Sequence, residues 1–201
     1  MTRYAMVIDT RTCIGCGDCV VACKTENKVP EGLNRDWIVE ATRGTYPNLT
    51  TEFRSERCNH CDNPPCTRVC PTQATWKRDS DGIVMMDWHR CIGCRYCLAA
   101  CPYGSRSFNW TDPRPHIEEI REDYPTRTKG VVEKCNFCVE RLAKGKIPAC
   151  VEAGRRAGCD ALFFGDLNDP DSEVSRLIAE NQTTRIRENL GTEPKVYYIG
   201  L

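Results

Sequence analysis

The sequence has 201 residues and carries 28 basic and 28 acidic side chains, so its formal net charge is zero. This balance does not favour a chain that binds nucleic acid or a charged membrane surface. Apolar residues reach only 40%, and the 16 cysteines are counted among them. The conventional hydrophobic core must therefore be thin, and we expect another kind of interaction to hold the fold together.

The 16 cysteines allow either a disulfide framework or metal sites. Disulfide frameworks occur mostly in short secreted chains, whereas these cysteines come in C-x-x-C pairs, which are typical of shared metal ligands. The first residues show no apolar stretch followed by a cleavage site, so we expect no signal peptide. No segment approaches the ~18 apolar residues that a membrane helix needs.

Residues 4–8 are apolar and predict a short strand. The first cysteine group follows, with the spacing Cys13-x2-Cys16-x2-Cys19-x3-Cys23. Residues 24–57 contain two strand-like stretches separated by Gly44 and Pro47, which predicts a hairpin insertion. The second cysteine group comes next, with the spacing Cys58-x2-Cys61-x4-Cys66-x3-Cys70.

Residues 83–86 predict another short strand. The third cysteine group is Cys91-x2-Cys94-x2-Cys97-x3-Cys101, and the fourth is Cys135-x2-Cys138 with Cys150 and Cys159. Residues 103–129, rich in proline and charge, predict a surface insertion. Both this insertion and the hairpin suit either a solvated loop or a partner contact. Residues 166–201 predict a C-terminal arm that packs on a neighbour, with a helix cap at Asp171-Ser172 before a helix at 173–178 and a strand-like end at 195–199.

The cysteine groups are related in pairs. The first and third groups share one spacing, and residues 56–61 (E-R-C-N-H-C) match residues 133–138 (E-K-C-N-F-C). The chain is therefore a duplicated unit with two groups in each half. The alignment places Gly154 where the repeat calls for a cysteine, and Cys159 lies five residues further on.

The run C-x2-C-x2-C-x3-C is that of bacterial ferredoxins, in which three cysteines bind one four-iron cluster and the fourth reaches across to another. Gly15 and Gly93 lie inside these runs, where a positive φ or a close backbone approach is expected. Structural zinc is the alternative, because two distant C-x2-C pairs can close one tetrahedral site. The second and fourth groups fit zinc when taken alone, but the two triple runs do not.

Ligand exchange between the groups predicts four iron–sulfur sites. Cluster A takes Cys13, Cys16 and Cys19, cluster B takes Cys135, Cys138, Cys150 and Cys23, cluster C takes Cys58, Cys61, Cys66 and Cys101, and cluster D takes Cys91, Cys94, Cys97 and Cys70. Cys159 is the expected fourth ligand of cluster A. The alternative is that Cys159 is a free buried thiol and that the site is a [3Fe–4S] cluster or has a non-protein ligand. We expect no histidine ligand, because the thiols leave no vacancy.

Several motifs then resemble one family: C-N-H-C-D-N-P-P-C at 58–66, C-I-G-C at 91–94, C-P-Y-G at 101–104 and P-A-C-V-E-A at 148–153. The chain resembles the four-cluster iron–sulfur subunits of polysulfide, respiratory arsenate, dimethyl sulfoxide and nitrite reductase systems. Residues 127–135 and 165–170 are also similar to the iron–sulfur subunit of sulfite-reduction-associated membrane complexes. The resemblance covers nearly the whole chain.

We therefore expect an α+β fold made of duplicated bacterial-ferredoxin-like modules with two [4Fe–4S] clusters each, short strands, hairpin insertions and long loops. One module comprises residues 1–23 and 130–165, and the other residues 58–102. Residues 24–57 are the hairpin insertion, 103–129 a second insertion and 166–201 the arm.

The resemblance implies a non-catalytic subunit that relays electrons between a quinone-binding membrane subunit and a molybdopterin-type catalytic subunit. It implies no small-molecule substrate of its own. The alternative is a sulfite-reduction-associated complex without molybdenum. We expect the chain to be held at the membrane by its partners, on the outer, periplasmic face through co-export or, alternatively, on the cytoplasmic face. A zinc-stabilised binding module and a self-contained iron–sulfur enzyme at the Gly154 site are the competing functions.

Overall fold

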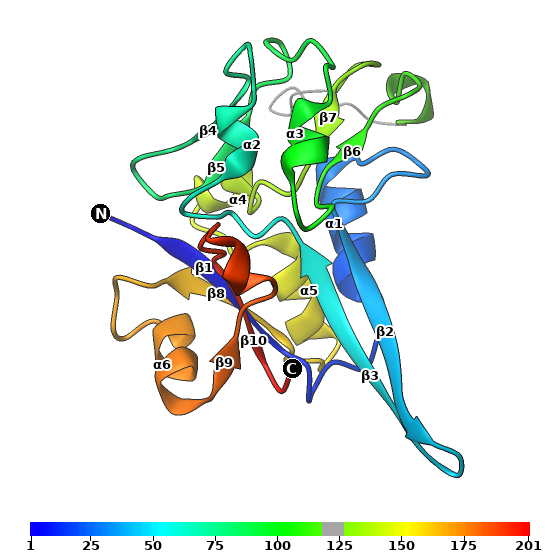
Figure 1. The fold of residues 1–201 in the computed structure, drawn as a ribbon, viewed down its shortest axis with the longest axis vertical. Helices are drawn as coiled ribbons and strands as arrows, with labels where there is room; N and C mark the ends of the chain where they lie inside the picture. The colour runs from blue at the N-terminus through cyan, green and yellow to red at the C-terminus, as the bar shows by residue number, and fades with distance from the viewer. Residues whose placement is uncertain (118–126) are drawn as a thin grey trace.

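The computed structural model describes residues 1–117 and 127–201, in which short helices and strands are joined by long loops (Figure 1). The helices are α1 (Asp18–Asn27), α2 (Pro65–Arg68), α3 (Tyr96–Ala100), α4 (Val139–Leu142), α5 (Ala149–Arg156) and α6 (Glu173–Glu180), with 3-10 turns η1 (Arg114–His116) and η2 (Glu188–Leu190). This mixed content agrees with the predicted α+β class. The predicted insertion at 103–129 falls partly outside the described residues.

The largest sheet has the strand order β8-β1-β10-β9. Its strands are β1 (Tyr4–Asp9), β8 (Leu162–Asp166), β9 (Thr183–Thr184) and β10 (Val196–Ile199). The predicted strand at 4–8 is confirmed as β1, which pairs antiparallel with β8 and parallel with β10. Figure 1 shows α6 beside this sheet at the lower left.

The two faces of β1 have different neighbours because successive side chains of a strand point to opposite faces. Ala5 and Val7 pack with Val174 of α6. Met6 and Ile8 belong to the main core, which also contains Cys19, Phe137 and Cys150. One face of the central strand is therefore covered by a helix, and the other packs against cysteines that the sequence predicts as cluster ligands.

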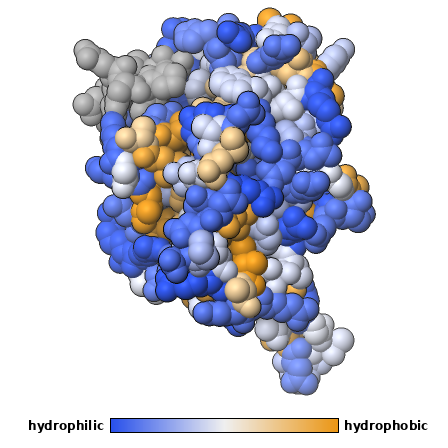
Figure 2. Space-filling view, turned by 90° about the vertical axis from the view of Figure 1, so that its left-hand side faces the viewer, coloured by the Kyte–Doolittle hydropathy of each residue, from blue (hydrophilic) through white to orange (hydrophobic). Residues whose placement is uncertain are grey.

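Strands β2 (Asp36–Thr45) and β3 (Asn48–Arg57) form a long antiparallel hairpin, which confirms the hairpin predicted within residues 24–57. The hairpin projects from the body at the bottom of Figure 1 and also stands out in the side view of Figure 2. Its tip is exposed, but Asp36, Ser55 and Arg57 at its base are buried. The base of the hairpin therefore reaches into the interior of the molecule.

Two small antiparallel pairs complete the described strands: β4 (Thr75–Lys77) with β5 (Val84–Met86), and β6 (Ser107–Phe108) with β7 (Val132–Glu133). The prediction of a strand near 83–86 is confirmed by β5. The small core beside these pairs consists of Cys66, Ala74, Val84, Met86, Cys97 and Val132. Cysteines thus occupy core positions in this half of the molecule as well.

The C-terminal segment folds back onto its own chain. Ser172 caps α6, as predicted, by accepting a hydrogen bond from the Ser175 amide. The backbone N–H of Lys195 donates to the Asn59 carbonyl at 2.9 Å, after which β10 enters the sheet beside β1. The prediction that the end of the arm packs on a neighbouring subunit is wrong for this strand, because its apolar side chains are buried against β1 and α6.

Candidate metal centres

In the first cysteine group, Cys13 and Cys16 lie on the loop before α1, and Cys19 and Cys23 lie on α1 itself. Cys159 joins this group from the segment that follows α5. All 16 cysteines are free of disulfide bonds. Burial raises the pKa of Cys13, and so do three neighbouring thiols, those of Cys159, Cys19 and Cys16. The structure therefore brings the predicted fourth ligand of cluster A next to the other three.

The geometry of α5 explains why residue 154 is a glycine. After α5 the chain turns back, and the Cys159 N–H donates to the Gly154 carbonyl at 2.9 Å. A Cβ atom on residue 154 would lie 3.0 Å from the Cys159 carbonyl oxygen, which is too close for a comfortable contact. The returning loop thus leaves little room for a side chain at 154 and brings the thiol of Cys159 to the first cysteine group.

The second group of four thiols surrounds one cavity. Its lining includes Cys23, Cys135, Cys138 and Cys150. The side-chain amide of Asn27 lies 3.7 Å from Cys23 Sγ and 3.9 Å from Cys138 Sγ, as a donor to both. A donor aimed at sulfur favours a thiolate there, so this cavity fits a thiolate-bound cluster.

The third group combines the second cysteine run with one cysteine from the third run. Burial is the main cause that raises the pKa of Cys61 to about 12, and the neighbouring thiols of Cys58, Cys66 and Cys101 contribute. These are the four predicted ligands of cluster C. Thiols in such surroundings stay neutral unless a metal supplies positive charge, since the thiolate is the form that binds metal.

The fourth group lies around α2 and α3. Cys97 interacts electrostatically with Cys91, and Cys70 and Cys91 both pack against the small core that contains Cys97. Hydrogen bonds from Thr75 and Thr72 lower the pKa of Cys70, although burial acts in the opposite direction. Cys94 lies on the exposed loop between Cys91 and α3.

The loops of the first and third cysteine runs follow the conformation expected from their glycines. Gly15 has φ +71° and Gly93 has φ +70°, in the left-handed region that favours glycine. A Cβ on Gly93 would lie 2.3 Å from the Gly130 carbonyl oxygen. Glycine is therefore required at Gly93 both by the backbone angle and by the close approach of residue 130.

Within residues 1–117 and 127–201, no three or more His, Cys, Asp or Glu side chains gather closely enough to hold a single metal ion. Four thiolates around a cube of four irons and four sulfides stand further apart than four thiolates around one zinc ion.

The four groups differ in exposure. In the groups predicted as ligands of clusters B and C, three cysteines are buried and the fourth is partly buried. In the other two groups, Cys16 and Cys94 are exposed. Each of these thiols follows an isoleucine on the same loop, and Ile14 is 67% and Ile92 66% exposed. Two groups are thus enclosed and two reach the surface.

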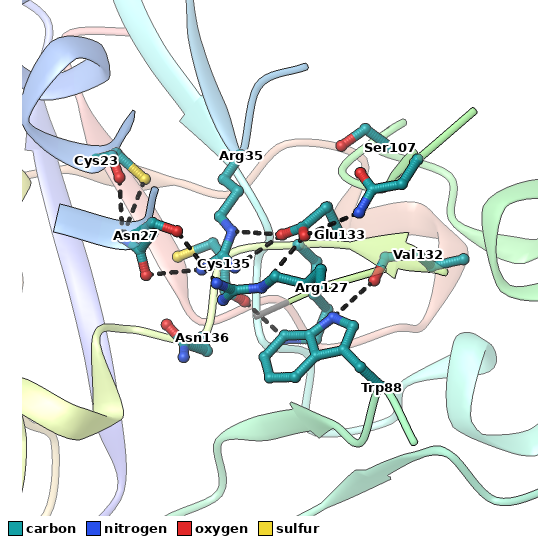
Figure 3. Close-up of polar contacts among 12 residues, drawn as sticks. Cys23, Asn27, Arg35, Trp88, Ser107, Arg127, Val132, Glu133, Cys135 and Asn136 are labelled. Carbon is teal, nitrogen blue, oxygen red and sulfur yellow. Dashed lines mark hydrogen bonds and ion pairs between the residues drawn. The ribbon is translucent and has the colours of Figure 1, made fainter. Parts of the chain in front are cut away.

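A buried ionic network lies beside the cavity of the second group (Figure 3). Arg35 donates to the Glu133 carboxylate at 3.0 and 2.7 Å, and Arg127 approaches the same carboxylate at 3.2 Å. Arg35 also donates to Asn27 Oδ1 at 2.7 Å. Through Asn27 the network is connected to the thiols of the second group. Apart from the family motif at 127–135, no sequence pattern predicted this ionic network.

His60 is a buried side chain that the sequence does not assign to a ligand set. Its ring stacks on Phe137 with 3.7 Å between centroids, and its Nδ1 accepts a hydrogen bond from the Val84 amide at 3.1 Å. Burial, assisted by the nearby cations Lys134 and Lys195, lowers its pKa well below the usual range. His60 is therefore a neutral packing residue between the second and fourth cysteine runs.

Two protein-family profiles, both described as a 4Fe–4S dicluster domain, match residues 12–74 and 49–115. The chain is 45% identical to the Hdr-like menaquinol oxidoreductase iron–sulfur subunit 1 of Archaeoglobus fulgidus, over 99% of this chain and 84% of that protein. It is 45% identical to a putative dimethyl sulfoxide reductase iron–sulfur subunit of Halobacterium salinarum, over 99% and 79%. It is 39% identical to the arsenate respiratory reductase iron–sulfur subunit of Shewanella, over 98% and 96%.

In the part of the chain that the structure describes, no helix has the length and apolar character needed to cross a membrane. The free cysteines, their arrangement in four groups and the full-length similarity agree with one another. The chain therefore belongs to the iron–sulfur electron-transfer subunits of respiratory oxidoreductases, and its cofactors are four [4Fe–4S] clusters.

Proposed function

We propose that the chain relays single electrons along a row of four clusters between two partner subunits. One partner is a catalytic subunit of the molybdopterin type, as in the reductases to which the chain is similar, and the other is a membrane subunit that interacts with quinone. When bound, each cluster supplies a centre that accepts and returns one electron. The protein holds these centres close together, shields the inner ones from water and presents the outer ones to its partners.

We assign the ligands by the four groups of thiols described above. Cluster A is held by Cys13, Cys16, Cys19 and Cys159, cluster B by Cys23, Cys135, Cys138 and Cys150, cluster C by Cys58, Cys61, Cys66 and Cys101, and cluster D by Cys70, Cys91, Cys94 and Cys97. This assignment is supported by the cavity of cluster B and by the neighbours of Cys13, Cys61 and Cys97.

The same contacts support the order A–B–C–D along the row. Cys58 of cluster C interacts with Cys135 of cluster B. Cys66 of cluster C interacts with Cys97 of cluster D. Arg57 interacts with Cys19 of cluster A and with Cys150 of cluster B. Each group therefore has one or two neighbouring groups, as a linear relay requires.

The observation that carries this proposal is the difference in exposure between the outer and inner groups. Clusters A and D each have one exposed thiol, Cys16 and Cys94, and an exposed isoleucine on the same loop. Most of the face drawn in Figure 2 is hydrophilic, with separate hydrophobic stretches. The exposed isoleucines mark an apolar contact point at each end of the relay.

Charged substitutions at the two ends test this relay. In the intact complex, Ile14→Glu is expected to slow electron exchange with one partner about tenfold or more, and Ile92→Glu with the other, because a charge is forced into an apolar contact. The measurement is cluster reduction by quinol and cluster reoxidation by the catalytic subunit, followed separately by rapid-mixing absorbance.

Leu190→Glu is the control, since Leu190 is also exposed but lies outside the cysteine loops. It is expected to change neither half-reaction. If Ile14→Glu and Ile92→Glu slow the same half-reaction, or neither does so, a relay with one partner at each end is wrong.

Cys159→Ala tests the assignment of cluster A. The wild-type chain is expected to contain about sixteen iron and sixteen sulfide, and the variant about fifteen or fewer iron, with only one cluster altered. Anaerobic metal analysis with electron paramagnetic resonance measures both. Full iron content and an unchanged spectrum would show that Cys159 is a bystander, whereas about four zinc without sulfide in the wild type would refute the iron–sulfur assignment.

We also propose that the fold consists of two repeat-related modules, residues 1–23 with 130–165 and residues 58–102. The pairing of β1 with β8 and the packing of α1 with α5 support the first module, and the packing of α2 with α3 supports the second. His60 and Phe137, which occupy equivalent repeat positions, stack on each other where the modules meet. The hairpin and residues 103–129 are insertions into this arrangement.

A second candidate function follows from the relative in Archaeoglobus fulgidus, which is named as part of an Hdr-like menaquinol oxidoreductase. In such a complex the electrons would pass between quinol and a catalytic subunit that holds no molybdenum. Metal analysis of the purified complex separates the two candidates. We place the chain at the membrane surface through its partners, on the outer face by co-export, which protease treatment of intact cells tests.

A further inference from the structure

Three cationic side chains are buried among the cysteine groups: Arg57, Arg106 and Lys134. Arg57 and Lys134 are 1% exposed, and Arg106 is 8% exposed. A buried charge is costly unless an anion compensates for it. Each of the three cations therefore needs a nearby anion that compensates for its charge.

Arg57 links cluster A to cluster B. Its Nη1 donates to Cys150 Sγ at 2.9 Å. Its Nη2 donates to Ser55 Oγ, which lies 3.6 Å from Cys19 Sγ. Asp36 completes its surroundings with an ion pair of 3.6 Å. One guanidinium group thus contacts a ligand of cluster B directly and a ligand of cluster A through one hydroxyl.

Arg106 occupies the corresponding place between clusters C and D. Its guanidinium interacts with the thiols of Cys66 and Cys97, which belong to different clusters in our assignment. Its Nη2 is fixed by donating to Thr75 Oγ1 at 2.9 Å. The two ends of the relay are therefore built alike, although Arg57 and Arg106 come from different parts of the repeat.

Lys134 lies at the middle junction. Its ammonium group interacts electrostatically with Cys58 of cluster C and Cys135 of cluster B. It donates to the Cys135 carbonyl at 2.6 Å and to the Val84 carbonyl. Lys134 occupies the repeat position equivalent to Arg57, so both halves place a cation directly before a cluster ligand.

In the cluster-loaded protein, the cysteine thiolates are the anions available to two of these cations. Within residues 1–117 and 127–201, neither Arg106 nor Lys134 forms an ion pair with a carboxylate. Burial opposes the charge of Arg57, yet Cys150 and Asp36 hold its pKa well above the ordinary value. Burial lowers the pKa of Lys134. The two arginines, in contrast, are charged at every accessible pH.

We propose that Arg57, Lys134 and Arg106 are fixed counter-charges, one at each of the three junctions between neighbouring clusters, and that each raises the reduction potentials of the two clusters beside it. This inference rests on the proposed relay and its ligand assignment. The three cations act on the clusters through their charge.

The physical reason is electrostatic. A reduced cluster carries one more negative charge than an oxidised one, so a nearby positive charge stabilises the reduced state. A cation at a junction acts on both flanking clusters and raises the reduction potential of each. Each transfer removes one electron from a cluster and adds it to the next, with no bond made or broken at the cation.

Three glutamine variants test this proposal on the cluster-loaded protein. Arg57→Gln is expected to lower the reduction potentials of clusters A and B, and Arg106→Gln those of clusters C and D. Lys134→Gln is expected to lower the reduction potentials of clusters B and C. Redox titration followed by electron paramagnetic resonance measures all four potentials, and Cys16→Ser marks the signal of cluster A.

Arg54→Gln is the control, because Arg54 lies on the same strand as Arg57 and pairs with Glu56 near the surface. It is expected to shift no potential. Arg57→Lys keeps the charge and is expected to retain most of the wild-type potentials. It therefore separates the effect of charge from that of lost packing, which iron content and melting temperature report.

The proposal is overturned if the variants keep about sixteen iron and all four potentials stay unchanged, or if every variant shifts all four equally. It is also overturned if Arg57→Lys lowers the potentials as much as Arg57→Gln. Fewer than four clusters in the wild-type chain would instead refute the proposed relay. Each glutamine variant that retains its four clusters tests the effect of the replaced cation on the two clusters beside it.

Discussion

Cys150→Ala is expected to leave no folded chain, whereas Cys94→Ala is expected to lose the iron of one cluster and remain folded. Cys150 is buried in the main core and accepts a hydrogen bond from Arg57, while Cys94 lies on an exposed loop. Structural metal binding contributes on the order of 10 kcal/mol to folding. That is comparable to the whole stability of a domain, about 5–15 kcal/mol.

The loss of an inner cluster also leaves Arg57 buried without its sulfur acceptor. The two variants are compared by anaerobic purification, iron analysis and far-ultraviolet circular dichroism. Cys94→Ala should retain about twelve or more iron and the wild-type helix signal. A soluble Cys150→Ala chain with a full complement of iron would show that the assignment of cluster B is wrong.

Glu133→Gln is expected to destabilise the protein by about 3–5 kcal/mol, because the change removes the anion shared by two buried arginines, Arg35 and Arg127. For a chain of this length this corresponds to a fall in melting temperature of about 6–20 °C. The measurement is an anaerobic thermal scan at one fixed heating rate, with iron content determined before heating.

Glu56→Gln is the matched control for this prediction. Glu56 precedes a cysteine at the equivalent position of the repeat, but its ion pair with Arg54 is partly exposed. A pair of this kind is worth at most about 1 kcal/mol. Equal losses for Glu133→Gln and Glu56→Gln would mean that the buried network contributes no more than a surface ion pair.

The local patterns of the sequence predicted much of this molecule. The apolar residues of β1, the hairpin of β2 and β3 and the cap at Ser172 are confirmed, because each depends on neighbouring residues. The anomaly at Gly154 was also visible in the repeat. Its cause was not, since it depends on how the chain turns back after α5.

The remainder depends on contacts between residues that are far apart in the sequence. Arg35 and Glu133 are separated by 98 positions, and a charged residue taken alone is more often exposed than buried. The apolar end of the C-terminal segment predicted an external contact because its partner strand, β1, lies near the other end of the sequence. A local sequence pattern cannot predict the pairing of two strands that lie so far apart in the sequence.

The parallel pairing of β1 with β10 has a consequence for how the protein is made. Residues 6–9 cannot gain this partner until residues 196–199 have left the ribosome. Cys13 must likewise wait for Cys159, and Cys23 for Cys150, before their thiols can gather. We therefore expect clusters A and B to be inserted after synthesis has passed the last strand. The module of residues 58–102 contains all the assigned thiols of clusters C and D, so these two can be assembled while the rest of the chain is still being translated.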